Sequence, residues 1–153
     1  MTHVRKQIRD RIAANLLDLT ATGKRVFESR LYSFQNAELP GICVYTKSET
    51  SERDTLQTTS GMTRTLDILV EGYAVAPQTG LLSLDMENML DQICEESEAA
   101  LGADPTCNGL CLDMFLSATE INYSGEGDLP VGTAVMTWTC TYRTTTTDPG
   151  TSL

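Results

Sequence analysis

The sequence predicts an α+β fold, in which two helices pack on one face of a mixed, mainly antiparallel sheet. Two segments repeat apolar residues every three or four positions, which is the period of an amphipathic helix. The other regular segments alternate along the chain with period two, which is typical of strands. Because these strands follow one another in runs, separated by a single internal helix, the order favours an antiparallel sheet with helices on one side.

The first predicted helix starts near the N-terminus. Its apolar residues form one stripe: Val4, Ile8, Ile12, Leu16 and Leu19. Most of the basic residues of this segment lie off that stripe. Gly23 suits the left-handed position that ends a helix, so we expect the helix to stop there.

Three strands are predicted between the two helices. They run from Val26 to Phe34, from Gly41 to Lys47 and from Thr63 to Ala76. The third is the clearest, because Leu66, Ile68 and Val70 point to one face while Asp67 and Glu71 point to the other.

A polar segment from Ser48 to Gly61 separates the second and third of these strands. It has no apolar face to bury, and it is rich in threonine, which favours extended backbone. The segment is therefore either a solvated loop or the tip of a long projecting hairpin. The segment is either a disordered surface loop without a specific function or an arm that orders only against a neighbouring subunit.

The second helix is predicted from Leu82 to Leu101, with Ser83 as its N-cap and Gly102 after its end. Its buried stripe consists of Met86, Met89, Leu90, Ile93, Ser97 and Leu101. The exposed face is acidic, with Asp91, Glu95, Glu96 and Glu98 and no basic residue. This face is a solvated surface, a contact for a basic partner or channel, or a Ca²⁺ or Mg²⁺ site, although such sites usually need loop oxygens too.

Two further strands complete the predicted domain. They run from Leu110 to Ser117 and from Ala134 to Tyr142, joined by the turn-forming residues Ser124 to Pro130. The domain therefore spans residues 1–143, and residues 144–153 form a polar tail.

Composition and charge exclude several classes of protein. The net charge is −10, which disfavours direct binding to nucleic-acid phosphates. It suits either a soluble surface whose copies repel one another or a surface past which DNA must slide. No apolar run is long enough to cross a membrane, and the N-terminus lacks the features of a signal peptide. The five scattered cysteines are expected to be reduced thiols that pack as small hydrophobic groups.

No constellation of residues predicts catalysis, a metal or a cofactor. His3 is the single histidine, so any nucleophile–histidine arrangement would have to rest on it. Cys107 and Cys111 form the one close cysteine pair, which is poor support for zinc without a second pair. Thr22-Gly23-Lys24 lacks the glycine and spacing of a phosphate-binding loop. We therefore predict a protein that is not an enzyme.

Several short stretches, in order and with matching spacing, resemble the tail terminator proteins of long-tailed phages. The amphipathic first helix leads to Thr22-Gly23 and then to Val26 through Phe34. The next matching stretches are Leu39-Pro40, Val44-Tyr45, Asp54-Thr55, Leu66 through Val70, Asp85-Met86-Glu87 and Thr141-Tyr142-Arg143. This sequence differs from the family by a longer, threonine-rich C-terminal tail and by more cysteines.

The resemblance implies an α+β protein of the virion without catalytic activity. Members of the family assemble as hexameric rings on the tail tube, stop polymerisation of the tube protein and present a surface to the head–tail connector protein. DNA passes through the lumen of the ring without specific binding. The expected location is the virion tail, reached from the host cytoplasm, and the expected partners are other copies of the chain, the tube protein and the connector.

The contact residues that we predict for the ring or tube interface are charged. They are Glu49, Glu52, Arg53 and Asp54 in the polar segment, and Asp67 and Glu71 on the third strand. Two other functions remain open: a head-completion or neck protein with a related fold, and a small cytoplasmic ligand-binding domain.

Overall fold

A computed structural model describes residues 2–28, 40–75, 82–124 and 131–153. The strands are β1 (Val26–Phe27), β2 (Gly41–Arg53), β3 (Gly61–Val75), β4 (Asp113–Ser124) and β5 (Val131–Thr145), and the helices are α1 (Val4–Asn15) and α2 (Leu82–Gly102). The sheet order is β1-β2-β3-β5-β4. β1 pairs with β2 in parallel, and every other pair is antiparallel.

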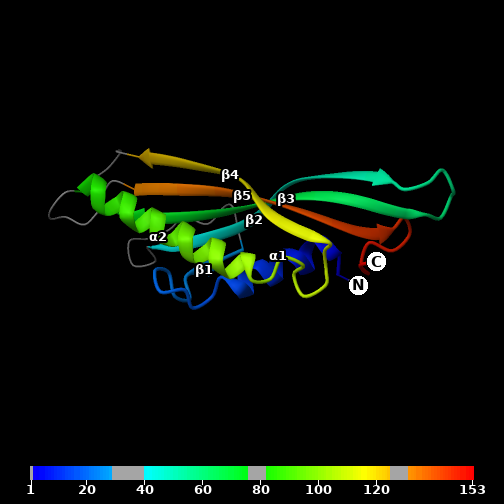
Figure 1. The fold of residues 1–153 in the computed structure, drawn as a ribbon, viewed down its shortest axis with the longest axis horizontal. Helices are drawn as coiled ribbons and strands as arrows, with labels where there is room; N and C mark the ends of the chain where they lie inside the picture. Colours follow the sequence, from blue (N-terminus) through cyan, green and yellow to red (C-terminus); the bar gives the residue numbers. More distant parts are fainter. Residues whose placement is uncertain (1, 29–39, 76–81, 125–130) are drawn as a thin grey trace.

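The predicted fold class is confirmed, since two helices accompany a five-stranded, mostly antiparallel sheet, and both helices lie below β3, β4 and β5 in the view of Figure 1. The core lies between the helices and the sheet, where the predicted stripe of α1 is buried from Val4 to Leu16 and most of the stripe of α2 is buried. Leu66, Ile68 and Val70 of β3 are fully buried, as their alternation predicts.

Two glycines bring α2 close to the sheet. A Cβ at Gly72 of β3 would lie 2.6 Å from Ile93 Cγ2, and one at Gly132 of β5 would lie 2.5 Å from Met86 Sδ. A larger residue at either position would force the facing Ile93 or Met86 side chain to move. The same geometry shows that the even-numbered residues of β3 and β5 face the helices. The odd-numbered residues lie on the opposite face, which neither described helix covers and which we call the uncovered face.

The polar segment between β2 and β3 is a long hairpin and not a loop. β2 continues to Arg53, six residues past the predicted end at Lys47, and pairs with β3 as far as Arg53 opposite Met62. The chain itself forms this ladder, so its order does not depend on a neighbouring subunit. The hairpin extends beyond the helices to one end of the molecule (Figure 1).

The end of the first helix differs from the prediction. α1 stops at Asn15, and a turn follows in which Asp18 has a φ of 63° and Gly23 a φ of 57°. The Gly23 N–H donates to Leu19 O at 2.7 Å, and the Asp18 N–H donates to Gly23 O at 2.9 Å. Gly23 therefore closes this turn and does not cap the helix.

Other boundaries also differ. β1 contains two residues, and residues 29–34 of the predicted strand lie outside the described residues. Ala76, the predicted end of β3, also lies outside them, and so does most of the turn between β4 and β5. β4 starts at Asp113, because the residues before it turn through positive φ at Cys107, Asn108 and Gly109. α2 starts at Leu82, so Ser83 lies within the helix and not at its N-cap.

The last strand also continues beyond its predicted end. β5 runs to Thr145, and Thr144 is fully buried. The residues after β5 return to the domain, where Pro149 O accepts a hydrogen bond from the Val4 N–H at 2.9 Å. The C-terminal segment thus contacts the start of α1.

Candidate interaction surface

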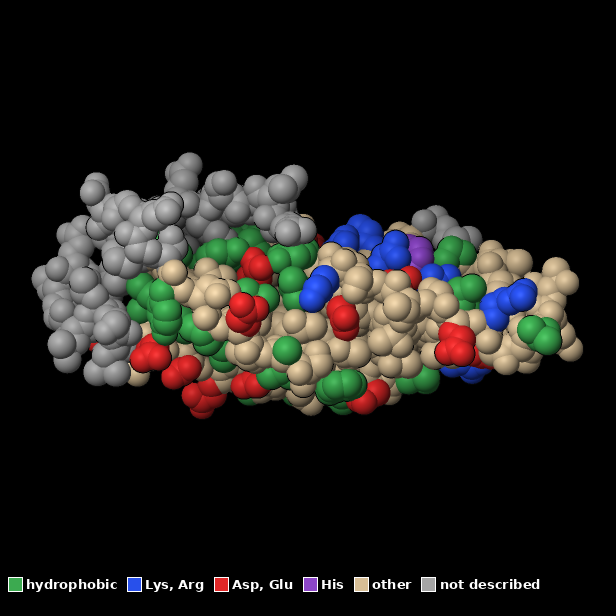
Figure 2. All heavy atoms as spheres, turned by 90° about the horizontal axis from the view of Figure 1, so that it is seen from above, with side chains coloured by type: hydrophobic (Ala, Val, Ile, Leu, Met, Phe, Trp, Pro, Cys, Tyr) green, Lys and Arg blue, Asp and Glu red, His purple; other side chains and the backbone are tan. Residues whose placement is uncertain are grey.

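Charged side chains are unevenly distributed over the surface. In Figure 2, acidic groups are concentrated along one long side of the molecule, whereas Lys and Arg side chains gather, next to His3, toward the other side. α1 carries Arg5, Lys6, Arg9 and Arg11 against a single acid, Asp10. α2 carries acids and no basic residue. The molecule therefore has a more basic side at α1 and an acidic side at α2.

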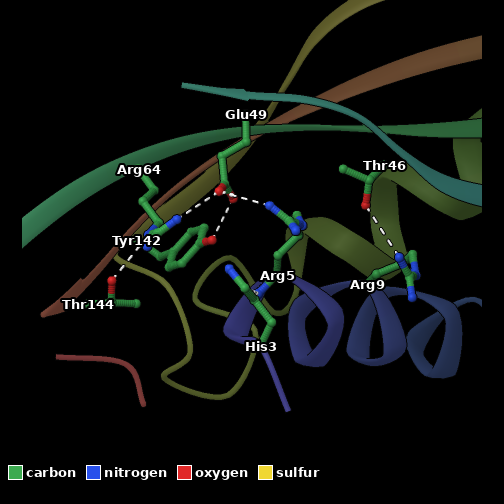
Figure 3. A network of polar contacts seen from close by, with 8 residues as sticks. All are labelled: His3, Arg5, Arg9, Thr46, Glu49, Arg64, Tyr142 and Thr144. Atoms are coloured by element: carbon green, nitrogen blue, oxygen red, sulfur yellow. Dashed lines mark hydrogen bonds and ion pairs between the residues drawn. The ribbon is translucent and has the colours of Figure 1, made fainter. Parts of the chain in front are cut away.

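The hairpin of residues 48–66, which we call the arm, is held at its root by a buried carboxylate. The side chain of Glu49 is 8% exposed, and its Oε1 accepts from Arg5 Nη1 at 3.0 Å and from Arg64 Nη1 at 3.1 Å. Its second oxygen accepts from the Tyr142 hydroxyl. Figure 3 shows these groups converging from α1, β2, β3 and β5.

Electrostatics at the root follow from this burial. Desolvation and the hydrogen bond to Glu49 raise the pKa of the Tyr142 hydroxyl, so it stays protonated and donates. Burial and the nearby Arg5 lower the pKa of His3, whose Nδ1 accepts from the Arg5 N–H at 3.1 Å. Neutral His3 thus caps α1 directly beside the network. A buried ion pair of this kind fixes geometry more than it adds stability.

The C-terminal segment also supports the root. Arg64 Nε donates to Thr144 Oγ1 at 3.1 Å, and Gln7 Nε2 donates to Gly150 O at 2.9 Å. The Leu153 N–H donates to Arg143 O at 2.9 Å. Residues from both ends of the chain therefore meet under the arm and fix its direction.

The tip of the arm is attached to β5. The carboxylate of Asp54 pairs with Arg143 and accepts from Thr63 Oγ1 at 2.7 Å. The Arg143 and Thr63 side chains lower the pKa of Asp54, so the pair is ionised near neutral pH. A Cβ at Gly61 would lie 2.4 Å from Asp54 Oδ2, so the pair fits because this position is a glycine.

The outer end of the arm presents groups with no role in the core. Leu56 lies in the turn and is 95% exposed, and Glu52 and Arg53 are exposed beside it. These side chains are therefore exposed at the end of a hairpin whose root and tip are both fixed.

The structure separates the six predicted contact residues into three groups. Glu49 is buried in the root network and Asp54 is paired with Arg143, so neither is a free surface charge. Glu52 and Arg53 are exposed on the arm. Asp67 and Glu71 lie apart from it, on the uncovered face of the sheet.

Asp67 and Glu71 are half-buried, and the prediction that they are exposed charges is wrong. Asp67 accepts from Thr139 Oγ1 at 2.9 Å, and Glu71 accepts from the hydroxyls of Tyr45 and Tyr73. Burial and Glu71 raise the pKa of Tyr73. These side chains share the uncovered face with a row of β5 threonines, which gives it a polar and acidic character.

Sequence reasoning missed four residues that build the arm: Arg5, Arg64, Tyr142 and Arg143. Arg64 had a detectable signal, because it shares the helix-facing side of β3 with the apolar Leu66 and Ile68. Charged side chains are rarely buried unless they are paired, so an arginine among core-facing apolar residues predicts a buried acidic partner.

The described residues offer no metal site and no membrane-spanning helix. No three His, Cys, Asp or Glu side chains gather there in a way that would hold an ion. No helix in the described part of the chain is long and apolar enough to cross a membrane. The five cysteines are free, as predicted, and burial raises the pKa of Cys43 and of Cys94 to about 11, so these thiols are unreactive near neutral pH.

Comparison with known proteins gives little to identify the chain. No family model matches the sequence, and no curated protein matches it. Among solved structures, the chain is similar to a protein in the virion of a native gene transfer agent particle, with 14% identity and a TM-score of 0.34 over 91% of this chain and 92% of that one. This likeness is too weak to assign a family or a function.

Proposed function

We propose that the chain is a structural subunit of a phage-like virion, without catalytic activity, and that it acts as a tail terminator. In this proposal six copies form a ring on the tail tube, stop addition of tube protein and present a surface to the head–tail connector. The family is proposed because short stretches of the sequence match tail terminator proteins in their order and spacing. The braced arm is the observation in the structure that carries the proposal.

The arm suits a subunit that must dock on a repeating surface. A hairpin that flexes loses conformational entropy when it binds, whereas one already fixed at root and tip loses less. Glu49 fixes the root and the Asp54–Arg143 pair fixes the tip. Leu56 and Arg53 then remain available for the neighbouring copy or the tube.

The uncovered face of the sheet suits the lumen of such a ring. Asp67 and Glu71 lie on it among threonine hydroxyls. Acidic groups repel DNA phosphates, and the Thr139 hydroxyl is already hydrogen-bonded to Asp67 and Ser117, so it offers a weak contact. DNA would therefore pass without adhering.

The proposal is tested by capping of tail tubes. Tube protein is polymerised in the presence of the purified chain or of the Leu56→Ser variant, and tube length is measured by electron microscopy. The chain should bind tube ends and shorten the tubes, and the variant should lose this effect while keeping its melting temperature, because Leu56 is 95% exposed.

Leu17→Ser is the matched control, since Leu17 is an exposed leucine remote in sequence from the arm. It should cap tubes as the unmodified chain does. Binding to a portal or connector without any effect on tube length would replace the terminator with a neck protein. Equal capping by Leu56→Ser and the unmodified chain would remove the arm from the interface.

A further inference from the structure

β4 is the outer strand of the sheet on the side away from β1. It is the last strand in the sheet order, and no strand in the described part of the chain pairs with its outer side. Every residue from Ser117 to Tyr123 is exposed, so neither face of this part of the strand is covered. A strand in this position presents a row of backbone donors and acceptors with which a strand of another chain can pair.

β4 lacks most of the features that keep natural edge strands from pairing. It is 12 residues long, it contains no Lys, Arg or Pro, and it has one irregularity, a register shift at Ser117. Phe115 and Ile121 are 51% and 40% exposed. They lie on opposite faces of the sheet, because Phe115 is opposite Thr139 and Ile121 is opposite Ala134. A strand added to this edge would therefore bury apolar surface on both faces.

One flank of α2 lies beside β4 and is acidic. Its residues follow one another at spacings of four, three and four, and so form one stripe along the helix: Glu87, Asp91, Cys94 and Glu98. The Tyr123 side chain of β4 lies next to this stripe, since desolvation and the carboxylates of Glu87 and Asp91 raise the pKa of its hydroxyl. None of the ion pairs among the described residues involves the three acids of the stripe.

No basic residue of the same region offsets this charge. The sequence has no Lys, Arg or His between Arg64 and Arg143, and both of these arginines are already paired with acids of the arm. β4 adds two acids of its own, Asp113 and Glu120. The charge of this edge therefore favours a positively charged partner. It disfavours a second copy of β4, which would bring like charges together.

We infer that β4 is a docking edge for a basic, extended segment of a partner protein, which adds to the sheet as a further strand. The side chains of such a strand alternate between the two faces of the sheet. On the helix side they would lie against Ile121 and Tyr123, where Lys or Arg can pack its aliphatic stem. Its charge would then reach Glu87 and Asp91. On the other face, apolar side chains would lie against Phe115, so the partner is a segment in which basic and apolar residues alternate.

The test uses a synthetic peptide in which Lys and Val alternate, matched in length to the 12 residues of β4. Its binding to the purified full chain is followed by fluorescence anisotropy, and hydrogen exchange read by mass spectrometry locates the bound peptide. Amides in Asp113–Ser124 should exchange roughly tenfold or more slowly in the complex, because pairing protects the outer amides of β4. A peptide in which Glu replaces Lys is the control and should not bind. The inference does not depend on the proposed ring, so this test and tube capping can fail separately.

A charge variant tests the acidic stripe of α2. Glu87→Gln combined with Asp91→Asn should weaken peptide binding roughly tenfold at low salt and leave the melting temperature nearly unchanged, since both side chains are exposed. Asp85→Asn is the matched control and should bind as the unmodified chain does. Asp85 is an exposed acid on the opposite flank of α2, in one stripe with Glu96, whose carboxylate accepts from the Ala21 N–H at 2.9 Å. Equal binding by the two variants would contradict the role of the stripe.

The two peptides and the exchange data also decide what the edge accepts. Equal binding of the Lys and Glu peptides, or no binding of either, would contradict a basic partner. Binding that leaves the β4 amides unprotected would show contact with the acidic stripe alone and would overturn strand addition. Protection of the same amides when the protein is concentrated without peptide would assign the edge to a second copy, which would also overturn the inference.

Discussion

The two ends of the sheet are stabilised by different physical means. At one end, α2 packs an apolar stripe onto β3 and β5, and glycines at 72 and 132 let it approach. At the other end, the arm is held by ion pairs and hydrogen bonds around Glu49 and Asp54. The first arrangement stabilises the fold, and the second directs a hairpin away from it. The polar end is the one to which the proposed function assigns contact with other chains.

The largest expected effect tests the apolar end. Ile93→Ala removes a fully buried side chain that contacts the sheet at Gly72, and it should lower the free energy of unfolding by about 2–5 kcal/mol. Urea denaturation at low and high salt should give the same loss, because no charge is involved. A loss that changed strongly with salt concentration would show that charges also stabilise the apolar end, which would contradict the comparison.

A smaller effect is expected at the polar end. Glu49→Gln removes the charge on which Arg5, Arg64 and Tyr142 converge, and it should cost about 1–3 kcal/mol in urea denaturation. Glu52→Gln is the matched control on the same strand, where the exposed side chain should change stability by less than about 0.5 kcal/mol. Equal losses in the two variants would mean that the root network has no special role.

The smallest effect is expected for Tyr142→Phe, at about 1 kcal/mol near neutral pH. This variant should also change how the stability of the protein depends on pH. Because burial and Glu49 raise the pKa of Tyr142 in the folded state, its contribution is complete below the unfolded-state pKa of about 10 and is lost as pH rises above it. Melting temperatures from pH 8 upward should therefore fall less steeply in the variant. Parallel curves would contradict the hydrogen bond to Glu49.

The sequence predicted the apolar end well because its signals are local. The stripe of α2 and the alternation of Leu66, Ile68 and Val70 each lie within one element, and burial follows from their period. β4 was predicted less well. Turn residues with positive φ before Asp113 interrupt an alternation that looked continuous in the sequence.

The arm was less accessible to sequence reasoning. Its polar residues gave no period, so a hairpin and a loop could not be distinguished before the ladder with β3 was known. The network joins residues 5, 49, 64 and 142, which only the topology brings together. A glutamate in a polar run looks like a surface charge, and nothing near Glu49 in the sequence shows that it is buried.

The most direct test of the central claim is native mass spectrometry of the purified chain across a concentration series. A hexamer that is present at the outset, or that grows as concentration rises, is the result expected for a ring-forming subunit. A stable dimer with no larger species would contradict the ring, because a two-fold contact uses the same surface on both copies and cannot propagate around six of them.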